Sequence, residues 1–362
     1  MNKLITILTN EIKLFFKIQK SEREWHIPFL ASFCTAVPLF LGLYFNKITY
    51  GSLACMSAFI ILYIPNKSLP IKMITILACS FGFMFAYTLG LLFSFNFLLS
   101  SIVLASFSFF IHWITLYFKM KSPGSFFFIM LASIASCTPF ELGSLYIKVG
   151  ILALGVMFAA TCALIYSFFI TKTKSKFDNS SIFLEIHKSK YKNLAESIII
   201  GIFVFISSIS GHLLNLQNPY WVTISCTTIM MGASIYHIIK KSIYRIVGTF
   251  LGLGSSLILL LINKNLFTIC ITITILQFLI ETIVVRHYAL AAMFFTPLTI
   301  LLTEINNPQL TNPQLIISAR FWNIFLGSLL GLVGGFLIHN EKVKQKTIIQ
   351  IRKTRIAFKK FN

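Results

Sequence analysis

The chain alternates long apolar blocks with short polar links from residue 26 to residue 339. The blocks hold roughly 17 to 25 residues, which is enough for a helix to cross a hydrocarbon layer of about 30 Å. We expect helices at 27–45, 48–64, 71–94, 97–118, 124–139, 144–171, 193–214, 219–236, 243–262, 266–285, 288–303 and 319–339. The pattern therefore predicts an all-α polytopic membrane protein with about twelve transmembrane helices.

The composition agrees with a membrane protein. Hydrophobic residues make up 57% of the 362 and charged residues 11%, with a mean hydropathy of +0.84. A soluble domain cannot bury so large an apolar fraction in its core. Charges interrupt residues 1–25 throughout, so this segment lacks the apolar core and the small-residue cleavage site of a secretory signal, and we expect it to stay on the mature chain.

Lysines and arginines indicate the orientation. If both termini are cytoplasmic, all but four of the 31 Lys and Arg residues lie on the inner side. The four on the outer side are Lys47, Lys148, Lys264 and Arg320. Cytoplasmic links of membrane proteins are rich in lysine and arginine. Adding or removing one predicted helix would exchange the inner and outer links after it and would remove this bias. We therefore expect a multi-pass protein of the bacterial inner membrane with both termini inside, and the net charge of +21 reflects this topology.

The two ends of the chain carry much of the basic charge. In residues 1–25, Leu4 and Leu8 share one helical face and Lys13 and Lys17 another, which is typical of an amphipathic helix lying in the interface. The tail, 340–362, interleaves basic and apolar residues and could bind anionic headgroups or stay solvated. The links between spans are too short to form a folded basic face, so we expect no nucleic-acid binding.

No pattern of catalytic or cofactor-binding chemistry is present. The seven cysteines all lie in apolar blocks and show neither CxxC nor His-paired spacing, so we interpret them as buried thiols. The sequence also lacks a phosphate-binding loop, a nucleophile elbow and a dinucleotide fingerprint. We therefore expect no metal, no cofactor and no enzyme.

The basic linker 172–192 divides the predicted spans into two groups of six, 26–171 and 193–339. The groups resemble each other, because Lys148 precedes Gly155 by seven residues just as Arg320 precedes Gly327. A group with an even number of spans returns the chain to the side where it began. Two such repeats are therefore parallel, related by an axis along the membrane normal, and we expect a pathway between them.

Three patches of the second half carry a family resemblance. They are NPYWVTISCTTIMM at 218–231, RIVGTFLGLG at 245–254, and the series VVRHYALAAMFFTPLTILLTE at 284–304 with ARFWNIFLGSLLG at 319–331. Their order and spacing resemble the fusaric acid resistance family, or aromatic acid exporters, whose fold is shared by plant aluminium-activated malate transporters. The resemblance implies export of small organic, aromatic carboxylate anions. Larger members carry a cytoplasmic domain after each bundle, where this chain has about 20 residues.

The candidate substrate-binding cations are Arg245, Arg286 and Arg320. A guanidinium group binds a carboxylate through a planar fork, so arginines at both mouths of a path suit an organic anion. Arg245 and Arg286 fall near predicted inner helix ends, where snorkelling to the interface is the alternative. The topology gives no reason for Arg320 on the outer side, and we expect it to meet substrate or Glu304.

Other candidates complete the predicted site. Trp221 and Tyr288 offer ring faces to a substrate, although aromatic residues also form membrane-interface belts. Pro297 frees a backbone carbonyl that Thr296 and Thr299 could satisfy, and such a break either lines a cavity or is a packing kink, so we include Thr296. Glu281 is the candidate proton carrier, with an ion pair to Arg286 as the alternative.

Three functions follow as hypotheses. The first is a proton-driven efflux transporter for small organic anions, and the second is a passive organic-anion channel, in which no acid needs to titrate. The third is a non-transporting scaffold that acts through the basic termini. Replacing Glu281 by Gln separates the first two, and deleting 342–362 tests the third. Homodimer formation is left open.

Overall fold

The computed structural model describes residues 24–65, 67–120, 122–171, 190–263, 265–306 and 313–341, together with 343, 345 and 349. All regular structure in these ranges is helical, which confirms the predicted class. The predicted interfacial helix (1–25), basic linker (172–192) and basic tail (340–362) lie almost wholly outside the described residues.

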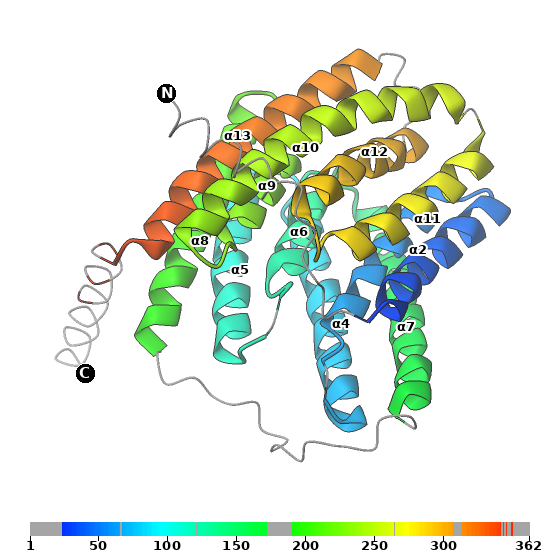
Figure 1. The fold of residues 1–362 in the computed structure, drawn as a ribbon, viewed down its shortest axis with the longest axis horizontal. Helices are drawn as coiled ribbons and strands as arrows, with labels where there is room; N and C mark the ends of the chain where they lie inside the picture. Colours follow the sequence, from blue (N-terminus) through cyan, green and yellow to red (C-terminus); the bar gives the residue numbers. More distant parts are fainter. Residues whose placement is uncertain are drawn as a thin grey trace, which may run out of the picture.

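The helices follow the apolar blocks closely (Figure 1). The first half contains α2 (His26–Tyr44), α3 (Ile48–Cys55), the 3-10 segment η1 (Met56–Tyr63), α4 (Leu69–Leu92), α5 (Phe97–Tyr117), α6 (Phe126–Ser136) and α7 (Leu142–Thr171). The second half contains α8 (Lys190–Leu213), α9 (Tyr220–Met230), α10 (Ile235–Ile262), α11 (Leu266–Ile283), α12 (Tyr288–Asn306) and α13 (Pro313–His339).

Not every helix is long enough to cross a membrane unaided. Among the described residues, eight helices have the length and hydropathy of a span, namely α2, α4, α5, α7, α8, α10, α11 and α13. The α3–η1 segment, α6 and α12 are apolar but shorter. An 11-residue helix such as α6 rises about 16 Å, half of a hydrocarbon layer. The predicted count of twelve spans, and their orientation, therefore stay predictions.

The predicted boundary between the helices at 219–236 and 243–262 is wrong. We expected a helix over 219–236 and a new one from 243, but α9 ends at Met230 and α10 already begins at Ile235. The side chain of Ser234 accepts a hydrogen bond from the backbone N–H of His237 and caps α10. A serine at this position satisfies one of the free amides of a new helix, which outweighs the apolar residues on either side.

Helix pairing follows the same order in both halves. α4 packs on α6 in the first half as α10 packs on α12 in the second, and α3 with η1 packs on α7 as α9 packs on α13. The two halves meet mainly along α5 and α8 and along α2 and α11, pairs that lie side by side in Figure 1, and they also meet where α6 packs on α9 and α3 on α12.

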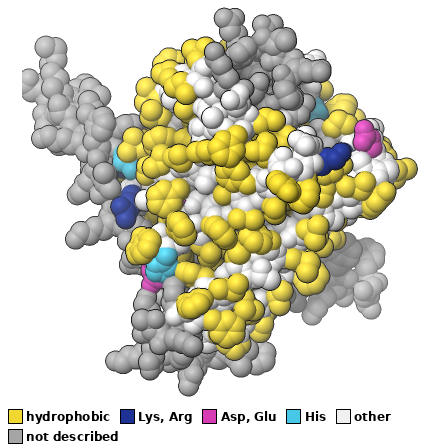
Figure 2. Space-filling model, turned by 90° about the vertical axis from the view of Figure 1, so that its right-hand side faces the viewer, with side chains coloured by type: hydrophobic (Ala, Val, Ile, Leu, Met, Phe, Trp, Pro, Cys, Tyr) yellow, Lys and Arg dark blue, Asp and Glu magenta, His cyan; other side chains and the backbone are white. Residues whose placement is uncertain are grey.

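The outer surface is apolar. Figure 2 shows one face covered mostly by hydrophobic side chains with few charged groups among them. Phe81 on α4 is 71% exposed and Phe250 on α10 is 67% exposed. Isolated apolar residues are common on soluble proteins, but a continuous apolar face of this extent fits lipid contact. The surface thus agrees with the composition in indicating a membrane protein.

Candidate functional site

Arg245 lies in the body of α10 and is buried, with 8% of its surface exposed. Its Nη1 donates a hydrogen bond to Tyr288 Oη at 2.9 Å, and its Nη2 donates one to Ser225 Oγ at 3.1 Å. Its Nε is buried and has no hydrogen-bond partner among the described residues. Because α10 begins at Ile235, Arg245 lies well inside the helix, and the predicted inner-end position is wrong.

Arg320 lies on α13 and is 6% exposed. Its Cζ lies 3.3 Å from the ring centre of Trp221, so the guanidinium covers the indole face. This contact uses the flat face of the cation and leaves its N–H edges free to donate. Nε and Nη1 are both buried and find no hydrogen-bond partner in the described part of the chain.

Glycines let α13 approach α9 closely enough to make this contact. A Cβ atom added at Gly327 would collide with the carbonyl oxygen of Val222, and one at Gly331 would lie 2.7 Å from that of Cys226. Any larger residue at these positions would push α13 away from α9. The two glycines therefore let Arg320 lie beside Trp221.

A second pair of glycines places Arg245 beside Tyr288. Cβ atoms added at Gly248 and Gly252 of α10 would each lie 2.6 Å from carbonyl oxygens of α12, those of Ala289 and Met293. Close packing of α10 on α12 brings the start of α12, and with it Tyr288, within reach of the guanidinium. By contrast, Gly254 faces open space and has no such role.

The helix α9 connects the two arginines. Trp221 contacts Arg320, and Ser225, one turn later on the same face, accepts from Arg245. The charge of Arg245 also acts on Arg320 across this space. The site therefore consists of two buried guanidinium groups that contact adjacent turns of α9. Its residues come from α9, α10, α12 and α13.

A third cation adds to the positive charge. Lys241, one turn before Arg245 on α10, holds its Nζ 5.2 Å from the ring centre of Tyr288, and it repels Arg245. No acidic side chain within the described ranges pairs with Arg245, Arg320 or Lys241. Buried charges are normally paired, so Arg245 and Arg320 are two buried cations without a carboxylate partner among the described residues, and the half-buried Lys241 lies beside them.

The structure separates Arg286 from this group. Arg286 lies in the link between α11 and α12 with its side chain exposed. Glu281 is buried on α11, 3% exposed, and its Oε1 accepts from Gln277 Nε2 at 3.2 Å. The side chain of Glu304, the alternative partner of Arg320, lies outside the described residues.

Thr296 is buried on α12, facing Gly252 of α10. Its hydroxyl donates to the Ala292 carbonyl at 3.2 Å, and that of Thr299 donates to the Thr296 carbonyl at 2.9 Å. Pro297 leaves the carbonyl of Met293 without its helical donor. Neither threonine reaches that carbonyl, so the predicted compensation is wrong.

Sequence reasoning missed Ser225 and Lys241. Both lie four residues from a predicted site residue, Ser225 after Trp221 and Lys241 before Arg245. Helical spacing of four puts residues on one face, so this signal was present in the sequence. For Lys241, this helical spacing applies only because α10 begins at Ile235, before Lys241, and not at 243 as predicted.

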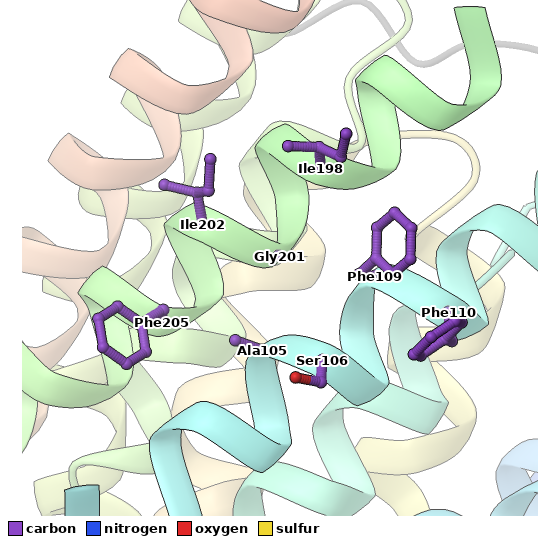
Figure 3. Close-up of a pocket in the computed structure, with 8 residues that line it drawn as sticks. All are labelled: Ala105, Ser106, Phe109, Phe110, Ile198, Gly201, Ile202 and Phe205. Atoms are coloured by element: carbon purple, nitrogen blue, oxygen red, sulfur yellow. The ribbon is translucent and has the colours of Figure 1, made fainter. Parts of the chain in front are cut away.

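An open groove of about 430 Å³ lies elsewhere, between α5 and α8 (Figure 3). Its lining residues are Ala105, Ser106, Phe109, Phe110, Ile198, Gly201, Ile202 and Phe205. Ser106 is the polar side chain among them, and none of the arginines takes part. The groove therefore differs from the arginine site in both place and chemistry.

Comparison with known families supports the predicted resemblance. The model of a family described as fusaric acid resistance protein-like matches residues 202–334. This range contains Arg245, Arg320, Trp221 and Tyr288, and it confirms the resemblance drawn from the three sequence patches.

One similar relative is the uncharacterized membrane protein YvaC of Bacillus subtilis (strain 168), 28% identical over 145 residues. The match covers 40% of this chain and 23% of that protein, so the chain aligns with less than a quarter of its relative. No solved structure matches the chain. The family match and the apolar helices together support a multi-pass membrane protein.

Proposed function

We propose that this protein is a transporter that moves small organic anions across a bacterial inner membrane, and that Arg245 and Arg320 bind the anion. The observation that carries the proposal is the set of buried guanidinium N–H groups without partners in the described part of the chain. The match to a fusaric acid resistance protein-like family supports the same class of function.

Electrostatics explains why an anion belongs here. A buried cation without a counter-charge is destabilised by several kcal/mol, and like charges nearby add to the effect. Arg245 and Arg320 are both buried, and Lys241 is close to Arg245. A carboxylate or sulfonate between the two guanidinium groups would accept their free N–H groups and neutralise part of the charge.

The surrounding rings favour an aromatic anion. Trp221 covers one face of Arg320, and Tyr288 accepts a hydrogen bond from Arg245 while Lys241 lies over its ring. Aromatic side chains pack against a planar substrate through ring faces and edges. An aromatic carboxylate is therefore the substrate class that we propose.

Proton-driven export is the finer part of the proposal. Glu281 is a buried acid on α11 and the proposed proton carrier, since an ionisable group inside a span is commonly functional. Both arginines are almost fully covered in this conformation, so the substrate enters only when helices move. This feature favours an alternating transporter over an open channel.

The pairing of helices supports two parallel six-helix repeats that move against each other. The first half pairs α4 with α6 and the second pairs α10 with α12, while α5–α8 and α2–α11 join the halves. Motion along these two seams would open the site to one side of the membrane and then to the other.

The proposal can be tested with the full chain in liposomes. Benzenesulfonate is a suitable probe because it stays charged and crosses bare bilayers slowly. We expect protein-dependent flux of this probe, and we expect Arg320→Gln to lower it at least tenfold. Arg286→Gln is the matched control, since it removes an exposed guanidinium and should change flux little. Equal loss in both variants, or no flux with the unaltered protein, would reject the proposal.

A further inference from the structure

A buried histidine outside the arginine site contacts a carboxylate across the seam between the halves. His112 lies on α5 and is 6% exposed. Its Nδ1 lies 2.8 Å from Ser125 Oγ, and its Nε2 lies 3.7 Å from Glu196 Oε1 on α8. Nε2 is buried and makes no hydrogen bond within the described residues.

These contacts suit a group that gains and loses a proton. Imidazole is the side chain that titrates closest to neutral pH when unperturbed. The Ser125 hydroxyl can either donate or accept, so Nδ1 keeps its hydrogen bond in both protonation states.

His112 occupies the same helical position as Glu281. It follows Asn96, the N-cap of α5, by the same number of residues by which Glu281 follows Asn265, the N-cap of α11. α5 and α11 are also the helices through which each half packs on the other, against α8 and α2 respectively. The α5–α8 seam therefore includes the helix that carries the buried His112, and the α2–α11 seam includes the helix that carries the buried Glu281.

The short helix α6 connects His112 with the arginine site. Ser125 stands at the start of α6, and its hydroxyl bonds His112 instead of capping the helix. At the other end, Cys137 contacts the backbone of Tyr220, the residue before Trp221. α6 also packs along α9, which carries Trp221 and Ser225. A shift of α6 would therefore change both its contact with His112 and its contact with α9.

We propose that His112 and Glu196 form a second proton-binding site, and that α6 couples its protonation to the Arg320–Trp221 contact. The proposal rests on the proposed anion transport and assigns a proton site to the first half. The groups that face the ring are the Glu196 carboxylate from α8 and the neutral Ser125 hydroxyl from the segment before α6. Protonation charges the ring that faces the Glu196 carboxylate, and release of the proton returns the ring to its neutral form.

A transport experiment separates proton coupling from anion binding. Liposomes containing the full chain are given a pH gradient, and benzenesulfonate movement is measured both uphill and, at equal pH, downhill. We expect His112→Gln to reduce uphill movement at least tenfold while downhill flux stays within about twofold. His26→Gln is the matched control, because His26 forms a similar pair with Glu24 at 2.7 Å but is more exposed. Uphill movement that survives in His112→Gln would overturn the proposal.

A spectroscopic measurement keeps the test independent of transport. Histidine-ring NMR of the detergent-solubilised chain should show one signal that His112→Gln removes. We expect that signal to change over the pH range in which the solubilised chain stays folded, and Glu196→Gln to alter that change. A signal that is constant over this range overturns the proton site even if transport occurs. A titrating signal with no benzenesulfonate flux would reject the proposed function and leave the proton site standing.

Discussion

Replacing Arg320 by Met should weaken anion binding without destabilising the empty protein. Most buried charged side chains behave differently, because removing one partner of a buried ion pair costs roughly 3–5 kcal/mol. Arg320 has no acidic partner among the described residues. Met has a similar length and fills an apolar space well.

The magnitude follows from the contacts of Arg320. Its Nε and Nη1 are buried donors without partners, and each such group costs about 1–3 kcal/mol. The contact with Trp221, which is shielded from solvent, stabilises the cation by about 2 kcal/mol. The difference predicts that Arg320→Met raises the free energy of unfolding of the ligand-free protein by between about 0 and 4 kcal/mol.

Binding should change in the opposite direction. A hydrogen bond to a charged group contributes about 1.5–3 kcal/mol, so losing the guanidinium should weaken benzenesulfonate binding about 10- to 100-fold. Calorimetry on the solubilised full chain would measure this affinity. Thermal unfolding with and without the probe would measure the stability of both states. Arg286→Met, an exposed arginine, should leave affinity and stability close to those of the unaltered chain.

The reasoning fails if the empty Arg320→Met protein is destabilised by about 3 kcal/mol or more. That result would mean that a protein carboxylate pairs with Arg320. Arg320 would then have a structural role, and its N–H groups would no longer be evidence for a bound anion.

Two further predictions concern packing and coupling. Gly327→Ala places a methyl group against the Val222 carbonyl and should destabilise the chain by about 1–3 kcal/mol. Gly254→Ala adds a methyl group in open space and should be neutral or stabilising by up to about 1 kcal/mol. Equal melting temperatures in the two variants would contradict the close α9–α13 contact. Glu281→Gln should remove uphill benzenesulfonate movement in liposomes and keep downhill flux, because a neutral amide cannot carry a proton. Normal uphill movement in this variant would exclude Glu281 as a proton carrier. A benzenesulfonate current through the unaltered chain without proton movement would favour the channel hypothesis.

Much of the fold could be predicted because lipid imposes a simple rule on the sequence. Backbone groups in hydrocarbon must be satisfied within a helix, so each apolar block becomes a helix near its predicted place. Glycines inside the apolar blocks lie at close helix contacts, as Gly248 and Gly327 show. The α9–α10 boundary was not, because Gly232 and Ser234 end one helix and start another within an apolar stretch.

The site could be predicted only in part for a related reason. Arg245 and Arg286 are both arginines, and each lies near the predicted inner end of its own helix. Arg245 is nevertheless buried, whereas Arg286 is exposed. The start of α10 at Ile235 decides the difference, since it moves Arg245 from an end to the interior. Partners such as Ser225 come from a different helix, and their distance along the chain gives no indication of contact.

The two halves share their packing but differ in their chemistry. A Cβ atom added at Gly155 of α7 would lie 2.6 Å from the Ala54 carbonyl of α3, the contact that Gly327 makes with Val222 in the second half. The residue before Ala54 is Leu53, where the second half has Trp221, and Lys148 is half-buried where the second half has the buried Arg320. Without an indole face and a planar cation, the first half cannot form the same guanidinium site. The pair of buried arginines therefore lies within the segment that matches the fusaric acid resistance protein-like family, while the first half contributes α5, which carries His112.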